Sequence, residues 1–382
     1  MARNPGVPRL LRRLNDRAAL ELLLTEGPLT RAELGELTGL SKVTAGQLLA
    51  RLEERGLVEV AGERASGRGP SAALYGVVPS SAYVAGLEVL PDSVTVGVAD
   101  ITGKIVVEVT VNPSRSGDPV KIVHSAVRRA CASAEVSLSQ LRAFVIGTRG
   151  VVDPRTGDVR FSYDLPAWHV GVLDSLRRTL GASVTIENDV NLVALAEHRH
   201  GAAVGVDDFA VVWAGVGQGL GVMLGGRLHR GISGGAGEIG WLPVPGEPLP
   251  IDVGEPQSGS YQRLVGQDAL AKLAAEHGLP PRPVAELVRA GHPGFLDAVA
   301  ARLAVGVAAV AVVLDPGLIV LSGDVGRAGG QDLAARVEEA VAQVCPSRPS
   351  VVASAVPGNP VLRGALAAAL EQAREQVFSD TV

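Results

Sequence analysis

The chain has 382 residues, which is enough for two or three domains rather than one core. Hydrophobic residues make up 47% of it and aromatic residues only 3%, so its cores must be built from Val, Leu, Ile and Ala, as in α/β proteins. The two cysteines, Cys131 and Cys345, lie far apart in the sequence, which excludes a disulfide framework and a cysteine-rich zinc site. The basic N-terminus lacks the apolar core of a signal peptide, and the longest apolar run, Leu303 to Leu314, is shorter than the roughly 20 residues of a membrane helix. We therefore expect a cytoplasmic protein without a membrane partner.

Charge is distributed unevenly along the chain. The net charge is −5, but residues 1–79 hold 11 Lys and Arg against 9 Asp and Glu, whereas the remainder holds 24 against 31. A mildly basic head on an acidic body is compatible with local contact to nucleic acid.

The first predicted elements are two short helices. An apolar helix over 17–26 is stopped by Gly27 and Pro28. Thr30 and Glu33 then form a capping box, in which each side chain satisfies a free amide at the start of a second helix.

A third helix is predicted over 42–56, with Ser41 as its N-cap. Its apolar residues recur at i, i+3, i+4 and i+7 and form one buried stripe, Ala45, Leu48, Leu49 and Leu52. Strands expected at 57–61 and 72–78 enclose a flexible basic loop. Three helices followed by a basic-tipped hairpin predict a winged helix-turn-helix domain over 1–79, although a small helical protein-interaction module is the alternative interpretation.

The candidate DNA contacts lie on the exposed face of the third helix and on the hairpin. Gln47 can pair with a base edge, and Lys42 with a phosphate or a guanine. The full predicted set is Ser41, Lys42, Val43, Thr44, Gln47, Arg51, Arg64 and Arg68. The expected partner is double-stranded DNA.

Residues 80–382 repeat one pattern of elements. Three short strands, YVAGLEVL, SVTVGVAD and KIVVEVTV, precede a helix that begins at Asp118-Pro119. Strands and helices then alternate until a second set of three strands, DFAVVWAG, GLGVMLGG and RLHRGIS. Two halves that each open with a three-strand meander predict a duplicated α/β fold with a ligand cleft between its lobes.

Long, ordered segments of the chain carry a family pattern. They are TRAELGELTGLSKVTAGQLLARLEERGLVE in the head, and IENDVNLVALAEHRHG, GVGQGLGVMLGGRLHRGISGGAGEIG and LDPGLIVLSGDV in the body. In these segments the chain resembles transcriptional regulators of the ROK family (repressor, open reading frame, kinase), of the xylose and N-acetylglucosamine repressor type.

The resemblance implies an architecture and an assembly. The head would be a winged helix-turn-helix, and the body an actin-like (ribonuclease H-like) duplicated sugar-kinase fold. Lobe one would cover about 80–187 plus a C-terminal helix at 361–377, and lobe two about 188–360. A homodimer or tetramer on a palindromic operator would follow.

The first phosphate loop of the kinase members is altered in this chain. Those members have an Asp-x-Gly-Gly-Thr turn where residues 88–92 read Glu-Val-Leu-Pro-Asp. A phosphate cradle needs backbone N–H groups and close approach, but Leu90 brings a side chain and Pro91 has no N–H. The second loop, 215–219, keeps its glycines, for which a tight hairpin is the alternative explanation. We therefore expect no catalytic residue, no kinase activity and no cofactor.

Five residues are candidate ligand contacts because of the resemblance. Asp189 matches the catalytic base of the kinases, and Asn188 and Glu238 match sugar-contacting positions. Arg149, in a loop that carries proline in the family, would place a cation near the ligand, and Trp241 could lie against a sugar ring. The alternatives are a helix N-terminal acid for Asp189 and an ion pair within the loop for Arg149.

The zinc ligands of the family are missing from the sequence. Trp241 stands where zinc-binding members carry His, and the segment PLPIDVGEPQSGSYQ contains no cysteine. A glutamate expected after that segment is replaced by Gln262. Since structural zinc needs four N or S ligands, we expect no metal.

These patterns predict a DNA-binding regulator, expected to repress carbohydrate-related genes, whose degenerate kinase-like domain senses a sugar or sugar derivative and dimerises. Two alternatives stay open. The body could serve only as an oligomerisation platform, or the chain could be an active sugar kinase with an accessory DNA-binding head.

Overall fold

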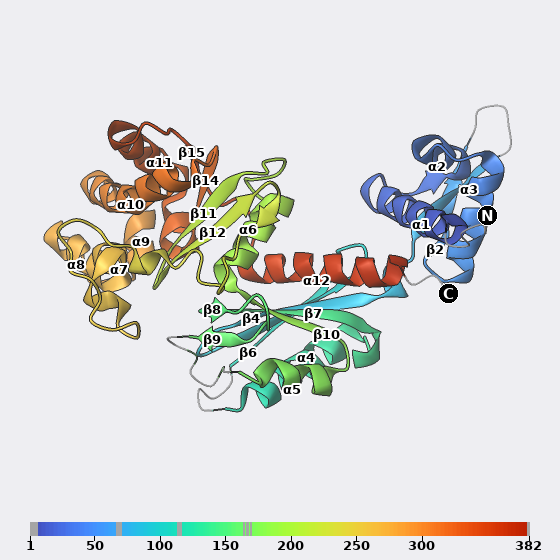
Figure 1. Cartoon of the computed structure of the whole chain (residues 1–382), viewed down its shortest axis with the longest axis horizontal. Coiled ribbons are helices and arrows are strands. Elements are labelled where there is room, and N and C mark those ends of the chain that lie inside the picture. Colours follow the sequence, from blue (N-terminus) through green and yellow to red (C-terminus); the bar gives the residue numbers. More distant parts are fainter. Residues whose placement is uncertain are drawn as a thin grey trace, which may run out of the picture.

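The computed structural model describes residues 7–65, 71–112, 117–162, 165, 168 and 170–379 (Figure 1). They form an N-terminal head and a body of two lobes. The head consists of α1 (Val7–Thr25), β1 (Leu29–Thr30), α2 (Arg31–Thr38), α3 (Lys42–Glu54), β2 (Val58–Arg64) and β3 (Ala72–Val77). Its strands pair antiparallel in the order β1-β3-β2, so the head is the expected winged helix-turn-helix.

The helix starts of the head follow the sequence signals in two cases and depart from them in one. The capping box of Thr30 and Glu33 is present at the start of α2, and Ser41 caps α3. However, α1 begins ten residues before the expected helix at 17. Leu10, Leu11 and Leu14 in its first turns are more than half exposed, so the helix is not extended there by burial of an apolar face. The high helix propensity of Leu and Arg explains the extension.

Lobe one is a five-stranded sheet with helices on both faces. Its elements are β4 (Tyr83–Val89), β5 (Val94–Asp100), β6 (Ile105–Val111), α4 (Pro119–Ala134), β7 (Leu141–Thr148), α5 (Val172–Leu180) and β10 (Ser183–Asn188), with a small hairpin of β8 (Val151–Val152) and β9 (Val159–Phe161). The strand order is β10-β7-β4-β5-β6, in which β10, β7 and β4 run parallel and β5 and β6 complete an antiparallel meander.

Lobe two repeats this topology. Its elements are α6 (Asp189–His200), β11 (Phe209–Ala214), β12 (Gln218–Leu224), β13 (Arg227–Leu228), α7 (Ser260–Val265), α8 (Gln267–Glu276), α9 (Val284–Arg289), α10 (Pro293–Leu314), β14 (Leu318–Ser322), α11 (Gly323–Val344) and β15 (Ser350–Ala353). The order β15-β14-β11-β12-β13 has the same pattern of parallel and antiparallel pairs as lobe one. The expected duplicated fold is confirmed, although β13 is shorter than the strand predicted there.

Two helices, α6 and α12 (Pro360–Ser379), pack together between the sheets. The helices approach closely, because a Cβ atom at Gly364 of α12 would lie 1.8 Å from the carbonyl oxygen of Leu192 in α6. On its other side α12 covers β4 and β5, where a Cβ at Gly86 would lie 2.8 Å from Leu366. The last helix of the chain therefore completes the core of lobe one.

The far end of α12 holds the head (Figure 1). Arg55, which follows α3, donates a hydrogen bond of 2.8 Å to the carbonyl oxygen of Val377. Phe378 is buried in the apolar cluster that joins the head to the body. A continuous core thus runs from the head along α12 to α6.

Among the described residues one helix, α10, is long and apolar enough to cross a membrane, with a mean hydropathy of 2.1. It is longer than the apolar run noticed in the sequence. Half of its most apolar window is buried, and Val299, Leu303 and Val307 lie in the core of lobe two. Core packing accounts for this composition.

Candidate functional site

The exposed face of α3 is the candidate DNA-reading surface. The stripe of Ala45, Leu48, Leu49 and Leu52 is buried as predicted. On the opposite side Ser41, Lys42, Val43, Thr44 and Gln47 are exposed, and Val43 has 70% of its surface accessible. The Oγ of Ser41 accepts a hydrogen bond of 3.2 Å from the Thr44 amide, which fixes the start of the helix. A capped helix with an unoccupied polar face can enter a major groove.

Arg51, a predicted DNA contact on α3, lies in an ion pair inside the head. Its guanidinium pairs with Asp16 of α1 at 2.6 Å, and Asp16 is only 1% exposed. A second bond of 3.2 Å joins Arg51 to the carbonyl oxygen of Gln47. If Arg51 turned to DNA, it would leave a buried carboxylate unpaired, which is costly. Arg51 therefore contributes to the packing of α1 on α3, and its contact with DNA stays a prediction.

The wing is anchored to α2 through Arg64. Its guanidinium pairs with Glu33, the acid of the capping box, while the other carboxylate oxygen of Glu33 accepts 2.9 Å bonds from the amide and hydroxyl of Thr30. These bonds and the charge of Arg64 lower the pKa of Glu33. Arg64 is half exposed at the loop end of β2, and Arg68, at the predicted tip of the hairpin, lies outside the described residues.

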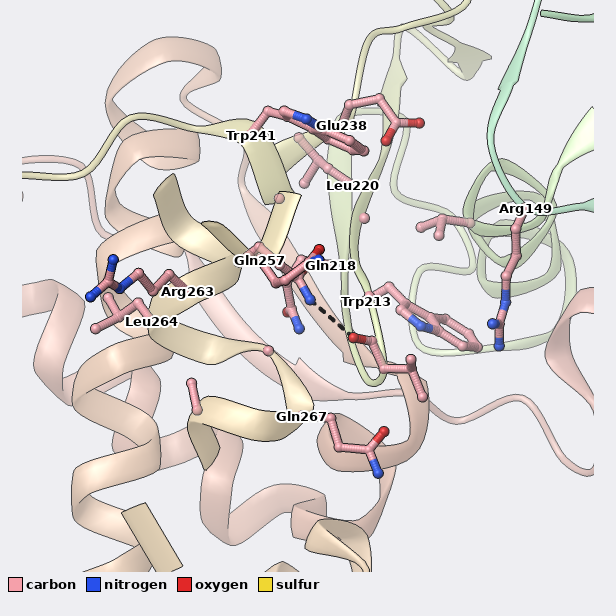
Figure 2. Close-up of a pocket in the computed structure, with 18 of the residues that line it drawn as sticks. Arg149, Trp213, Gln218, Leu220, Glu238, Trp241, Gln257, Arg263, Leu264 and Gln267 are labelled. Atoms are coloured by element: carbon pink, nitrogen blue, oxygen red, sulfur yellow. Dashed lines mark hydrogen bonds between the residues drawn. The ribbon is translucent and has the colours of Figure 1, made fainter. Parts of the chain in front are cut away.

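A cavity of about 780 Å³ lies where α6 meets β12 and α7 (Figure 2). All five candidate ligand residues line it, Arg149, Asn188, Asp189, Glu238 and Trp241. They come from three places in the sequence, the loop after β7, the β10–α6 junction and the segment after β13. The structure therefore brings together the residues that the family pattern singled out.

Asn188 and Asp189 have different local roles. The side chain of Asn188 caps α6 by accepting a 3.1 Å bond from the Asn191 amide, and its Nδ2 donates to the carbonyl oxygen of Gly150 at 3.0 Å. It thereby positions the loop that carries Arg149. Asp189 is the first residue of α6, is 9% exposed and lines the cavity.

Glu238 is an acid of the cavity whose pKa is raised by its surroundings. Burial, followed by the negative charge of Asp189, raises its pKa to about 7. One wall of the cavity therefore offers a carboxylate beside a carboxyl group that is half protonated near neutral pH. Such a pair can both accept and donate hydrogen bonds, which suits a ligand rich in hydroxyl groups.

Aromatic side chains form part of the cavity wall. Trp241 meets Phe161 edge-on, with 6.2 Å between ring centroids, and its buried indole N–H donates to no other described residue. Trp213, at the end of β11, also lines the cavity and lies beside Arg149 in Figure 2. Trp213 and Phe161 were not predicted from the sequence as cavity residues. Aromatic residues make up only 3% of the chain, and this rarity is the signal that could have drawn attention to them.

The first phosphate loop does not keep the form of an open cradle. The turn after β4 is closed by a 2.9 Å bond from the Leu90 amide to the Ser93 carbonyl, and Glu88 accepts a 2.5 Å bond from Asn359. Burial raises the pKa of Glu88, and the positive charge of Arg149 opposes that rise.

The second loop is held by glutamine side chains. The Nε2 of Gln218 donates to the carbonyl oxygen of Gly215 at 3.3 Å and to that of Val265 at 3.1 Å, and the Nε2 of Gln262 donates to the carbonyl oxygen of Val216 at 3.0 Å. These bonds tie the carbonyl groups of the glycine loop to its own lobe and to α7.

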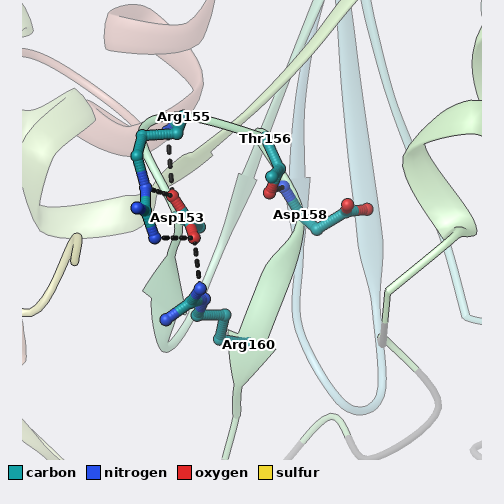
Figure 3. A network of polar contacts seen from close by, with 5 residues as sticks. All are labelled: Asp153, Arg155, Thr156, Asp158 and Arg160. Atoms are coloured by element: carbon teal, nitrogen blue, oxygen red, sulfur yellow. Dashed lines mark hydrogen bonds and ion pairs between the residues drawn. The ribbon is translucent and has the colours of Figure 1, made fainter.

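The hairpin that follows Arg149 is fixed by a buried acid (Figure 3). Asp153 is fully buried. Its carboxylate accepts a hydrogen bond of 2.9 Å from the Arg155 amide and forms an ion pair of 2.7 Å with Arg160. The bonds to Arg155 contribute most to lowering the pKa of Asp153. The loop of Arg149 is thus bounded by Asn188 on one side and by this network on the other.

No group of three or more His, Cys, Asp and Glu side chains in the described part of the chain could hold a metal ion. The absence of structural zinc stays a prediction.

Comparison with known proteins gives two family matches. The ROK family matches residues 84–372, and the MarR family matches residues 12–69. The N-acetylglucosamine repressor of Escherichia coli is 26% identical over 242 residues, which are 63% of this chain and 59% of the repressor. The match therefore spans less than two thirds of the length of that relative.

Two solved structures extend the comparison. A ROK family transcriptional regulator, a homologue of the E. coli MLC protein, covers 97% of this chain and 100% of its own with a TM-score of 0.74. At 16% identity this likeness is evidence on the fold alone. The ROK hexokinase from Thermus thermophilus is 30% identical, covers 76% of this chain and 98% of its own, and has a TM-score of 0.62.

Proposed function

The chain belongs to the ROK family, and from this premise we propose that it is a DNA-binding transcriptional regulator that represses carbohydrate-related genes. The observation that carries the proposal is the fusion of two surfaces in one chain. The capped helix α3 presents a free polar face, and the body encloses a cavity lined by Asp189 and Glu238. We propose that it acts in the cytoplasm as a homodimer or tetramer on a palindromic operator.

The proposed effector is a sugar or sugar derivative. Asn188, Asp189 and Glu238 line the cavity with groups that exchange hydrogen bonds with hydroxyls, and Trp241 offers an aromatic surface. Arg149 also lines the cavity, and a guanidinium matches carboxylate or phosphate groups bidentately. An anionic sugar, such as a sugar acid or a sugar phosphate, is the favoured form.

We propose that the body does not phosphorylate sugars. The turn at Leu90 and Pro91 lacks the open backbone of a phosphate cradle, because Pro91 has no N–H and the Leu90 amide is bonded to the Ser93 carbonyl. ADP release with a panel of sugars should stay at the background level. A release that is lost in Asp189→Asn would establish the kinase activity instead.

The regulatory proposal is tested by mapping the bound sites of the full-length protein across the genome of its host. We expect a few palindromic sites beside carbohydrate genes. Lys42→Ala, which removes a cation from the exposed face of α3, should weaken their occupancy. An unchanged map in a variant lacking the positive and polar groups of that face would contradict DNA binding through α3.

Effector binding is tested by thermal shifts with neutral sugars, sugar acids and sugar phosphates. A stabilising compound should lose its effect in Asp189→Ala. An anionic compound should also lose affinity in Arg149→Ala. If no compound shifts the melting temperature, the body is an oligomerisation platform, and the sensing part of the proposal is wrong.

A further inference from the structure

The cavity extends well beyond the two carboxylates. Its volume of about 780 Å³ lies in the upper part of the range that holds drug-sized molecules, which are larger than one sugar ring. Asp189 and Glu238 occupy one region of the wall, while Gln257 and Gln267 line other parts of it. A single ring that contacts both acids would leave much of this space to water.

Two indoles occupy separate positions along the wall. The chain has only 3 Trp, and two of them, Trp213 and Trp241, line this one cavity. Both are partly exposed, whereas Trp168 is 6% exposed in the core of lobe one. In Figure 2, Trp241 lies beside Glu238 and Trp213 lies beside Arg149, with Gln218 between them. Apolar packing of a core does not explain two partly exposed indoles that line one cavity.

Each indole has polar neighbours that suit a hydroxylated ring. Near Trp241 lies Glu238, whose carboxyl group lines the same cavity. Trp213 and Gln267 line the same cavity, and Gln267 also borders the loop at Gly215 that follows Trp213. The amide of Gln267 makes no side-chain hydrogen bond to any described residue, and it can both donate and accept.

We propose that the cavity has two ring-binding subsites and that the effector is a disaccharide rather than a monosaccharide. The first subsite comprises Asp189, Glu238 and Trp241, and the second comprises Trp213 and Gln267. This inference rests on the proposed sugar-sensing function and specifies the size of the ligand. The apolar face of each sugar ring packs on one indole, and the hydroxyl groups bond to the acids and the amide.

The test compares matched sugars on the full-length protein by isothermal titration calorimetry. The probes are xylose and xylobiose, glucose and cellobiose, and N-acetylglucosamine and its β-1,4-linked disaccharide. We expect at least one disaccharide to bind about tenfold more tightly than its monosaccharide, the gain that one additional aromatic contact can supply.

The same substitution at each indole locates the subsites. Trp213→Leu should lower the affinity for the disaccharide about tenfold more than the affinity for the monosaccharide, and Trp213→Phe should restore part of the loss. Trp241→Leu, the matched control in the first subsite, should weaken both ligands by a similar factor. Circular dichroism and the melting temperature show whether each variant is folded.

The outcomes separate the inference from the function on which it rests. Equal affinities for the two members of every pair, or equal losses for both ligands in Trp213→Leu, would overturn the two-subsite inference while leaving sugar sensing intact. Binding of none of the six neutral sugars would overturn the disaccharide inference, while the sugar acids and sugar phosphates of the thermal-shift panel still test the sugar-sensing function separately.

Discussion

Replacing Glu238 with Gln tests the electrostatics of the cavity directly. The substitution keeps the shape of the side chain and removes its titration. In the folded protein burial and the charge of Asp189 raise the pKa of Glu238 from 4.5 to about 7. A raised pKa means that the folded state binds the proton more tightly than the unfolded state does. The favourable contribution is complete below pH 4.5 and is lost as the pH rises through 7.

The size of the effect follows from that pKa. At about 1.4 kcal/mol per pKa unit, the wild type should lose up to about 3 kcal/mol of unfolding free energy between pH 4.5 and pH 8. Glu238→Gln should escape this loss. The variant and the wild type should therefore differ little near pH 5, and the variant should be the more stable protein at pH 8.

The assay is denaturant unfolding at pH 5 and pH 8, followed by circular dichroism and the fluorescence of the cavity tryptophans. Glu276→Gln, an exposed change on α8, is the control and should show no such pH dependence. In a protein that keeps Glu238, Asp189→Asn removes the neighbouring negative charge and lowers the pKa of Glu238. The loss of unfolding free energy should then occur at lower pH. A stability difference between Glu238→Gln and wild type that is the same at both pH values would refute the reasoning.

Three further substitutions test other parts of the structure. Gly364→Ala should lower the unfolding free energy by about 1–3 kcal/mol, because its methyl group would collide with Leu192; an unchanged melting temperature would contradict the close contact of α12 with α6. Arg51→Ala should lower the unfolding free energy by about 1–3 kcal/mol and weaken binding to all DNA sites alike. Adding Asp16→Ala should recover part of that stability, because it removes the buried carboxylate that has lost its partner. No recovery in the double variant would contradict this role of the Arg51–Asp16 pair. Gln47→Ala should alter the base preference in a selection of bound sequences, and an unaltered preference would exclude base contact by Gln47.

Much of the head and of the cavity could be predicted because local signals and an ordered family pattern specify them. Short-range interactions determine the capping box at Thr30 and the buried stripe of α3. The duplicated strand order follows from the order of strands and helices along the chain. The five cavity residues were found by their positions in long motifs. The ligand roles of these residues and the domain borders stay predictions.

The missed features depend on contacts between distant segments. Arg51 reads as an exposed cation on a recognition helix, and only the packing of α1 shows that Asp16 is buried against it. Trp213 lies at the end of an apolar strand, where its sequence context resembles core. Its place in the cavity follows from the position of the glycine loop and of Arg149, which come from different lobes.

The position of α12 has a consequence for how the protein is made. The strands of lobe one leave the ribosome long before the helix that covers them, because β4 and β5 come early in the chain and α12 comes at its end. Until then Gly86, Gly97 and their neighbours present an apolar face without its partner Leu366. Exposed sheet faces of this kind make nascent chains prone to aggregation and to proteolysis. A polypeptide that ends before residue 360 would thus lack both the helix that completes lobe one and the anchor of the head at Val377, so the head can dock only on a chain that includes α12.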